Sequence, residues 1–279
     1  MPEPFDQLLD ATLQHLYALK EQGLRYVAVS PETLAALLSP RANAPMLHAP
    51  RSPGPSSVHA PTLHAPTLNP ARSDATRTQA MAEIRERALQ CVKCPHLASS
   101  RKNVVFGVGS IDAEIMFVGE APGADEDQQG EPFVGKAGQL LTRIIETMGL
   151  KRDQVYIANI LKCRPNTPGQ SAGNRKPTPE EMQTCIPYLH AQIDLIKPKV
   201  LVALGATAVE GLLGRTEGIT RLRGNWKTYR NIPLMPTYHP AYLLRNQAMS
   251  EKRRVWEDML QVMEKAGMPI SEKQRNYFL

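Results

Sequence analysis

Four short apolar runs, each followed by a helical pattern, constrain the fold of this chain more than any other feature. The runs span 113–119, 155–161, 200–205 and 232–238. Each is short, rich in β-branched residues and bounded by turn residues, which is typical of strands buried on both faces of a sheet. The sequence therefore predicts four buried strands.

Helical patterns lie between and after these runs. They span 136–148, 179–196, 206–213 and 249–266. Strands that alternate with helices predict an α/β domain, because a parallel sheet needs helical connections that cover its faces. We expect a three-layer α/β/α sandwich with a mostly parallel, four-stranded central sheet, preceded by an N-terminal helical extension.

The chain before this domain has a different composition. Residues 5–20 place several leucines on one side of a predicted helix, and 27–38 suggest a second small element, so we expect a helical segment over 1–38. Residues 39–80 are rich in Pro, Ala and His and cannot bury enough apolar surface to offset their ordering entropy. We expect a disordered linker there, and the folded domain at 81–279.

The charge of the chain is compatible with a polyanionic partner. The net charge is +6, and since acidic and basic residues balance over 1–80, the whole excess lies in 81–279. No apolar run approaches the roughly 20 residues of a membrane span, and the N-terminus is acidic rather than basic and then apolar. We expect a cytoplasmic, non-secreted protein that is not associated with a membrane.

Polar residues follow the predicted strands. Glu120 comes after the first run, Asn159 lies late in the second, and His239 follows the fourth. Alone, each has a simpler explanation, such as a helix cap, a buried amide or a turn. The carboxyl ends of parallel strands share one edge of a sheet, where ligands bind. We therefore predict that this carboxylate, amide and imidazole form one functional site.

The stretch at 130–137, GEPFVGKA, has most of a phosphate-binding loop. Ala137 occupies the place of the hydroxyl that would hold magnesium, and an acidic loop precedes the stretch in place of a strand. We therefore exclude a nucleotide hydrolase. Phe133 is either a core residue or a platform on which a flat ligand stacks.

Four cysteines, Cys91, Cys94, Cys163 and Cys185, form one close pair and two distant single positions. In a reducing compartment such residues are free thiols or metal ligands. Zinc ribbons usually present two close pairs, whereas scattered cysteines often complete an iron–sulfur cluster. The pattern favours a cluster, but zinc and four unrelated buried thiols stay open as alternatives.

The segments GEAPGADEDQQGEPFVGKAGQLL, YIANILKCRP, VLVALGATA and HPAYLLRN, together with the four cysteines, resemble family 4 uracil-DNA glycosylases, the iron–sulfur branch of that superfamily. The resemblance covers about residues 86–265. It implies the α/β glycosylase fold and a [4Fe-4S] cluster on Cys91, Cys94, Cys163 and Cys185. It also implies that the protein is a hydrolase that excises uracil from DNA and leaves an abasic site, as a step of base excision repair.

The resemblance also assigns roles to individual residues. It implies that the catalytic residues are Glu120, Glu126 and His239, and that the substrate-binding residues are Ala121, Phe133 and Asn159. Leu243 and Leu244 are candidates to fill the space that a flipped base leaves, with Arg245 on a phosphate. An amide at position 159 suits uracil, because its oxygen accepts from N3–H while its NH2 donates to O4, a pattern that cytosine inverts.

This chain departs from related sequences in three ways. Ala121 stands where the best-known branch has a catalytic aspartate, so the carboxylate that orients the water is Glu120 or Glu126. A related branch has a histidine that becomes bonded to the sugar, and no histidine occurs between 97 and 189. We therefore expect turnover without a trapped adduct. Residues 1–80 have no counterpart in compact members, and we expect 1–38 to contact a replication or repair protein.

A second reading belongs to a different functional class. In it, the chain is a non-catalytic iron–sulfur protein that binds DNA, recognises damage and joins the replication machinery through residues 1–38. Excision of uracil from an oligonucleotide separates the two readings.

Overall fold

The computed structural model describes residues 70–167, 174–214 and 216–279, which belong to one compact unit. The helical segment expected at 1–38, and the expected linker as far as residue 69, lie outside the described residues. None of the described helices is long and apolar enough to cross a membrane.

A mixed sheet of six strands forms the centre of the domain, in the order β1-β3-β2-β4-β6-β5. The strands are β1 (Val108–Gly109), β2 (Ile115–Gly119), β3 (Tyr156–Asn159), β4 (Val200–Leu204), β5 (Lys227–Tyr229) and β6 (Ile232–Thr237). Strands β3, β2, β4 and β6 are parallel to one another, which confirms the four-stranded core. The antiparallel edge strands β1 and β5 were not predicted, because neither is long or apolar enough to give a strand pattern.

The helices follow the predicted order. They are α3 (Pro70–Leu89), α4 (Pro95–Ser100), α5 (Ala124–Gln129), α6 (Lys136–Thr147), α7 (Pro179–Ile196), α8 (Ala206–Leu213), α9 (Ile219–Leu222), α10 (Pro240–Arg245), α11 (Met249–Lys265) and α12 (Glu272–Arg275), with a 3₁₀ turn η1 at Arg152–Gln154. Helices α6, α7, α8 and α11 match the four predicted ones within a residue or two. Helix α7 begins with a capping box, in which the Thr178 hydroxyl accepts from the Glu181 N–H.

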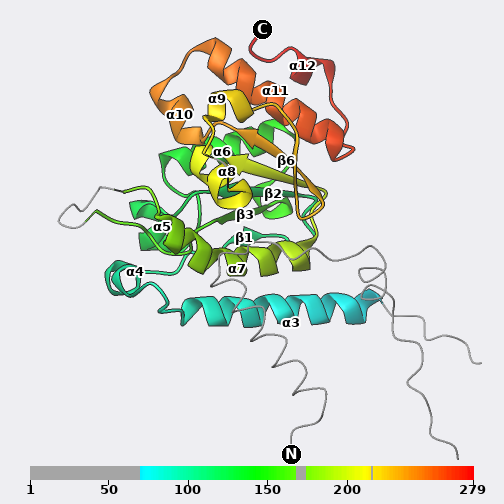
Figure 1. Cartoon of the computed structure of the whole chain (residues 1–279). Helices are drawn as coiled ribbons and strands as arrows, with labels where there is room; N and C mark the ends of the chain where they lie inside the picture. Colours follow the sequence, from blue (N-terminus) through cyan, green and yellow to red (C-terminus); the bar gives the residue numbers. More distant parts are fainter. Residues whose placement is uncertain (1–69, 168–173, 215) are drawn as a thin grey trace, which may run out of the picture. The chain divides into compact units, whose positions relative to one another are not determined.

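Alternating side chains of the strands pack into two cores, one on each face of the sheet. Met116 and Val118 of β2 face the core that contains α3, α7 and α8 residues, while Ile115 and Phe117 face the core that contains α6 and α11 residues. Figure 1 shows α3 lying alongside α7, outside the sheet. The domain therefore has the expected three-layer α/β/α architecture.

The linker predicted over 39–80 was wrong at its end, because residues 70–80 form the first part of helix α3. Met81, Ile84 and Ala88 are spaced along one helix face and are buried in the core against α7. The Arg77 guanidinium donates to the backbone oxygens of Ile111 and Leu195. The prolines that made the segment look like a linker end at residue 70, and the residues after it favour a helix.

The four parallel strands end at the same edge of the sheet. The register pairs Gly119 of β2 with Asn159 of β3, and Leu204 of β4 with Thr237 of β6. Glu120 comes directly after β2, and His239 lies two residues after the end of β6. The predicted polar residues therefore lie along one edge.

Candidate active site

Asn159, the last residue of β3, is buried with 1% of its surface exposed. Among the described residues, its Oδ1 is the only buried side-chain oxygen or nitrogen that has no hydrogen-bond partner. Gly119 lies beside it, and a Cβ there would come 2.4 Å from Oδ1 and 2.5 Å from Phe133 Cζ. Only glycine at 119 leaves room for the Asn159 amide and the Phe133 ring to approach each other.

Phe133 reaches this position through an unusual backbone conformation. Its φ is +55°, in the left-handed region that non-glycine residues rarely adopt. A Cβ on Gly138 would lie 1.8 Å from the Phe133 carbonyl oxygen, so a glycine in α6 accommodates this turn. The ring is 6% exposed, and its centroid lies 5.6 Å from that of His239, at an interplanar angle of 31°. Asn159, Phe133 and His239 thus meet at one place.

The His239 ring has a defined protonation state. Its Nδ1 accepts a hydrogen bond of 3.2 Å from the backbone N–H of Ala241, at the start of α10. In a neutral imidazole the other nitrogen, Nε2, then carries the proton. Burial, with a smaller contribution from Arg245, lowers the pKa of His239 to about 4, while Glu126 opposes the shift. His239 is therefore neutral at physiological pH, with its proton on Nε2.

The Glu126 carboxylate holds together two loops of the site. One oxygen accepts from the N–H of Gly123, and the other accepts from the N–H groups of Val134 and Gly135, all at 3.0 Å. These bonds join the loop after β2 to the loop that carries Phe133. Its negative charge also acts on His239.

Glu120 lies at the same edge of the sheet but faces α8. Its side chain hydrogen-bonds Thr207, and burial raises its pKa, with Glu210 adding to the rise while Thr207 and Lys176 oppose it. Glu120 follows the last residue of β2, and its side chain lies near Thr207 and Glu210 of α8. Ala121 packs partly against the core on that face. The structure brings Asn159, Phe133, His239 and Glu126 together and places Glu120 beside this group, toward α8.

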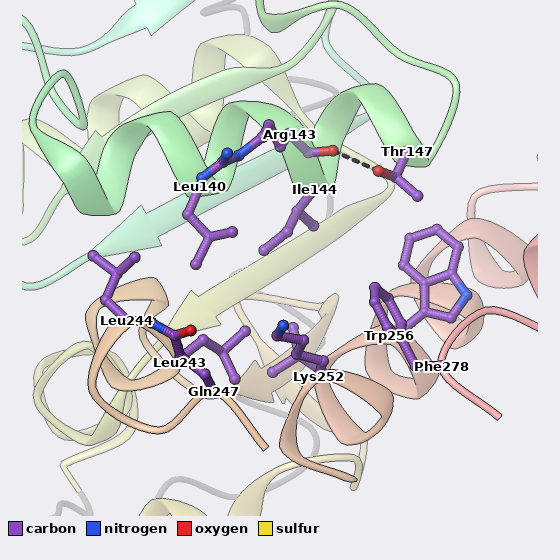
Figure 2. Close-up of a pocket in the computed structure, with 11 residues that line it drawn as sticks. Leu140, Arg143, Ile144, Thr147, Leu243, Leu244, Gln247, Lys252, Trp256 and Phe278 are labelled. Carbon is purple, nitrogen blue, oxygen red and sulfur yellow. Dashed lines mark hydrogen bonds between the residues drawn. The ribbon is translucent and has the colours of Figure 1, made fainter. Parts of the chain in front are cut away.

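The predicted DNA-contacting residues differ in exposure. A cavity of about 390 Å³ opens where α6 meets α10 and α11, and Figure 2 shows Leu243 and Leu244 among its lining residues. Leu243 is only 6% exposed and packs with Tyr238 and Val255 as a core residue. Leu244 is half-buried, which leaves it as the wedge candidate. Arg245 is exposed, as a phosphate contact requires.

The four cysteines converge on one small cavity. Cys91, Cys94, Cys163 and Cys185 line it together with Leu97, Arg101, Leu161 and Thr184. The Arg101 guanidinium donates to Cys163 Sγ at 3.1 Å, and a backbone N–H donates to Cys185 Sγ at 3.2 Å. Burial raises the pKa of Cys185 to about 12. No three His, Cys, Asp or Glu side chains among the described residues are close enough to hold a single metal ion.

Comparison with known proteins identifies the fold. The sequence model of the uracil DNA glycosylase superfamily matches residues 106–260, which is more than half of the chain. The chain belongs to the uracil-DNA glycosylase superfamily. This agrees with the resemblance of the four motifs, and the matched range contains Glu120, Asn159 and His239.

Several relatives in this superfamily are type-4 uracil-DNA glycosylases. The Thermotoga maritima protein is 46% identical over 188 residues, which is 66% of this chain and 93% of the relative. The Sulfurisphaera tokodaii protein is 43% identical, over 68% and 86% of the two chains. The Archaeoglobus fulgidus protein is 41% identical, over 62% and 88%. Within the uracil-DNA glycosylase superfamily, the chain is a member of the type-4 branch.

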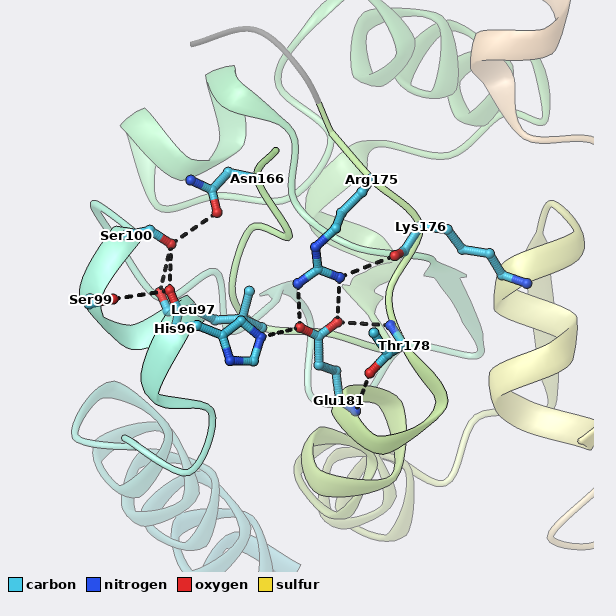
Figure 3. Close-up of polar contacts among 9 residues, drawn as sticks. All are labelled: His96, Leu97, Ser99, Ser100, Asn166, Arg175, Lys176, Thr178 and Glu181. Atoms are coloured by element: carbon cyan, nitrogen blue, oxygen red, sulfur yellow. Dashed lines mark hydrogen bonds and ion pairs between the residues drawn. The ribbon is translucent and has the colours of Figure 1, made fainter. Parts of the chain in front are cut away.

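One further cluster in this uracil-DNA glycosylase fold was missed from the sequence. Figure 3 shows the buried Glu181 carboxylate between Arg175, Thr178 and His96. It accepts two bonds from the Arg175 guanidinium, at 2.5 and 2.8 Å, one of 2.8 Å from the Thr178 N–H, and lies 2.5 Å from His96 Nε2. Arg175 is the main reason why the pKa of Glu181 falls to about 2. Glu181 thereby joins α4, next to Cys94, to the start of α7.

Proposed function

We propose that the protein excises uracil from DNA by hydrolysing the N-glycosidic bond of an extruded deoxyuridine, which leaves an abasic site. The observation that carries this proposal is the unpaired Oδ1 of Asn159. Leaving a buried acceptor without a partner costs about 1–3 kcal/mol. A ligand that brings a donor to this atom recovers that cost, and uracil N3–H is such a donor.

Asn159 also supplies selectivity among bases. Its Oδ1 accepts from uracil N3–H, and its Nδ2 donates to O4. Cytosine presents an acceptor at N3 and a donor at C4, so both groups of Asn159 would be buried without partners. Mismatches of this kind are worth about 10⁴-fold in discrimination.

His239 and Phe133 act on the departing base. Breaking the bond places negative charge on uracil, and His239 Nε2–H donates to O2, where part of this charge develops. The low pKa keeps the ring neutral, and a neutral imidazole is too weak an acid to give up its Nε2 proton, so the base leaves as an anion held by the site. The Phe133 ring supports the plane of the base from the loop that Glu126 braces.

The two glutamates have different roles in this proposal. Both Glu126 oxygens accept backbone N–H bonds, so Glu126 positions the Phe133 loop and adds negative charge near the electron-deficient sugar. Glu120 orients the attacking water at C1′, because its half-buried carboxylate lies at the end of β2 with one hydrogen bond, to Thr207. Ala121 supplies a small side chain and a backbone N–H next to it.

DNA reaches the site as a flipped nucleotide. Unstacking costs a few kcal/mol, and it costs least for mispaired or single-stranded uracil. Leu244 fills the space that the base leaves, and the exposed Arg245 beside it binds a phosphate. Binding should therefore weaken as salt rises.

The four cysteines fit the iron–sulfur cluster of the type-4 branch. They line one cavity, and two of the sulfurs accept N–H bonds. In this proposal Cys91, Cys94, Cys163 and Cys185 hold a [4Fe-4S] cluster. When bound it supplies cross-links between loops, since glycosidic hydrolysis transfers no electrons.

The N-terminal part extends the proposal beyond the catalytic domain. Residues 1–38 are proposed to contact a replication or repair protein, and the chain is proposed to act as a monomer on nucleoid DNA. The leucines within 5–20 and the basic excess of 81–279 support these two proposals.

An alkali-cleavage assay tests the proposed activity. Purified protein is incubated with an oligonucleotide that contains one uracil, as U:G, U:A or single strand, and abasic sites are then cleaved with alkali. We expect one cut at the uracil position and free uracil as product. An uncut strand at stoichiometric protein would contradict the proposal and leave the non-catalytic reading.

A further inference from the structure

Lys162 is buried in the interior, with 1% of its surface exposed, and the proposed function gives it no role. Its Nζ donates to the backbone oxygen of Asn159 at 3.0 Å and to Gln192 Oε1 at 2.7 Å. The ammonium also lies 5.8 Å from the centroid of the Phe106 ring. Burying a cation is costly, so a lysine placed among neutral groups indicates a specific task.

The position of Lys162 in the sheet indicates that task. Strand β1 pairs with β3 at Val108–Ile157, and continuing this register by two residues places Phe106 opposite Asn159. The ladder stops before that pair. Instead, Gln192 Nε2 donates to the Phe106 oxygen at 3.0 Å, while Lys162 donates to the Asn159 oxygen. The Lys162–Gln192 pair therefore joins the two backbones between the end of the ladder and the next direct backbone bond, from the Val105 N–H to the Lys162 oxygen at 2.8 Å.

The surrounding residues accommodate this pair. Gln192 Nε2 also donates to the Tyr156 hydroxyl at 3.0 Å. Gly107 has a φ of +143°, and a Cβ there would lie 2.9 Å from the Tyr156 hydroxyl and 3.1 Å from Gln192 Nε2. A glycine is thus needed at the point where β1 leaves the ladder and makes room for the buried pair.

We propose that Lys162 is a positioning residue for uracil recognition, which fixes the backbone of Asn159 and thereby the direction of its side-chain amide. This inference rests on the proposed role of Asn159. Fixing the carbonyl of a residue restricts rotation about its backbone, and the Asn159 amide must present Oδ1 and Nδ2 to two adjacent atoms of the base. A small rotation would misalign both hydrogen bonds together.

The same contacts connect recognition of the base to the cysteine cavity. The Lys162 backbone N–H donates to Cys185 Sγ at 3.2 Å, and Gln192 lies two turns after Cys185 on α7. Movement of α7 at Cys185 would therefore reach Asn159 through Lys162 and Gln192.

The test compares Lys162→Met with the parent protein and with Lys151→Met, which changes an exposed lysine that precedes β3 in sequence. Methionine keeps the apolar stem and removes the donor. We expect Lys162→Met to raise KM for uracil-containing DNA and to weaken inhibition by free uracil, each about tenfold, with a smaller change in kcat. Iron content and Tm are measured on each variant, and Lys151→Met should match the parent throughout.

A second variant covers the case in which Lys162→Met fails to fold or loses iron. Gln192→Leu keeps Lys162 but removes the bridge to Phe106, and we expect the same rise in KM and the same weaker inhibition by uracil. An unchanged KM and an unchanged inhibition constant in the folded, iron-containing variant would overturn the inference.

Asn159→Ala separates the two proposals. If Asn159→Ala leaves inhibition by uracil unchanged, the proposed role of Asn159 is wrong. If Asn159→Ala weakens inhibition but Lys162→Met and Gln192→Leu do not, only the proposed role of Lys162 is wrong.

Discussion

The backbone N–H of Ala241 donates a hydrogen bond to Nδ1 of His239 at 3.2 Å. This bond selects the tautomer that carries its proton on Nε2, the atom free to face a substrate. The start of α10 thus prepares His239 as a donor before any ligand arrives. In the proposed function, the His-Pro sequence that begins this helix has a chemical role as well as a structural one.

His239→Ala should slow uracil excision by about 10²- to 10³-fold, the range typical for removing one donor to a developing oxyanion. His190→Ala is a matched control, because His190 is a half-buried histidine on α7 that bonds Tyr229. We expect the control to excise uracil at nearly the parent rate. Single-turnover rates measure both, and equal rates for the two variants would show that His239 is not the donor.

The pKa of His239 should be directly visible by NMR. Its ring is expected to titrate near pH 4, well below the ordinary value of about 6.5. Because the folded-state pKa is lowered, the unfolded chain binds the proton more readily, and stability should fall as pH drops from about 6.5 toward 4. His239→Gln should lack this part of the acid destabilisation. A ring signal that titrates near 6.5 would contradict the burial argument.

The two glutamates should respond differently to the loss of charge. Glu126→Gln cannot accept three backbone N–H bonds as the carboxylate does, so we expect a loss of about 1–3 kcal/mol in the free energy of unfolding as well as slower excision. Glu120→Gln should slow excision with little change in stability. Chemical denaturation and single-turnover rates measure both quantities. Excision at the parent rate by Glu120→Gln would show that another group orients the water.

Leu243 and Leu244 form a matched pair that separates packing from DNA contact. Leu243→Ala should cost about 2–5 kcal/mol of stability, because it opens a cavity in the core. Leu244→Ala should cost much less, and it should slow excision from duplex DNA more than from single strands, since only the duplex needs a wedge. Equal losses on both substrates would argue against that role.

Much of the fold could be predicted from the sequence. The four parallel strands and helices α6, α7, α8 and α11 have strong apolar patterns, so local and tertiary preferences agree. Helix α3 was missed at 70–80 because a composition average over 39–80 mixes prolines with the helix-forming residues that follow them. Strands β1 and β5 have too few residues for a pattern, and they exist because the sheet offers them edges.

The site was less predictable than the fold. Asn159 and His239 could be placed together because both follow from the ends of parallel strands. The direction of Glu120 toward Thr207, the bracing of two loops by Glu126, and the burial of Leu243 depend on tertiary packing. The role proposed for Lys162 could not be predicted, because no sequence pattern shows that a lysine will be buried and bond the backbone of the strand that precedes it.

The most direct test of the central claim is single-turnover excision by the parent protein and by Asn159→Ala, on two strands that differ only in having uracil or cytosine at one position. The claim predicts that the parent excises a base only from the uracil strand. It also predicts that Asn159→Ala is at least as stable as the parent but at least about a hundredfold slower, because it loses an acceptor that only the substrate satisfies. Equal rates for the two proteins on the uracil strand would contradict the claim.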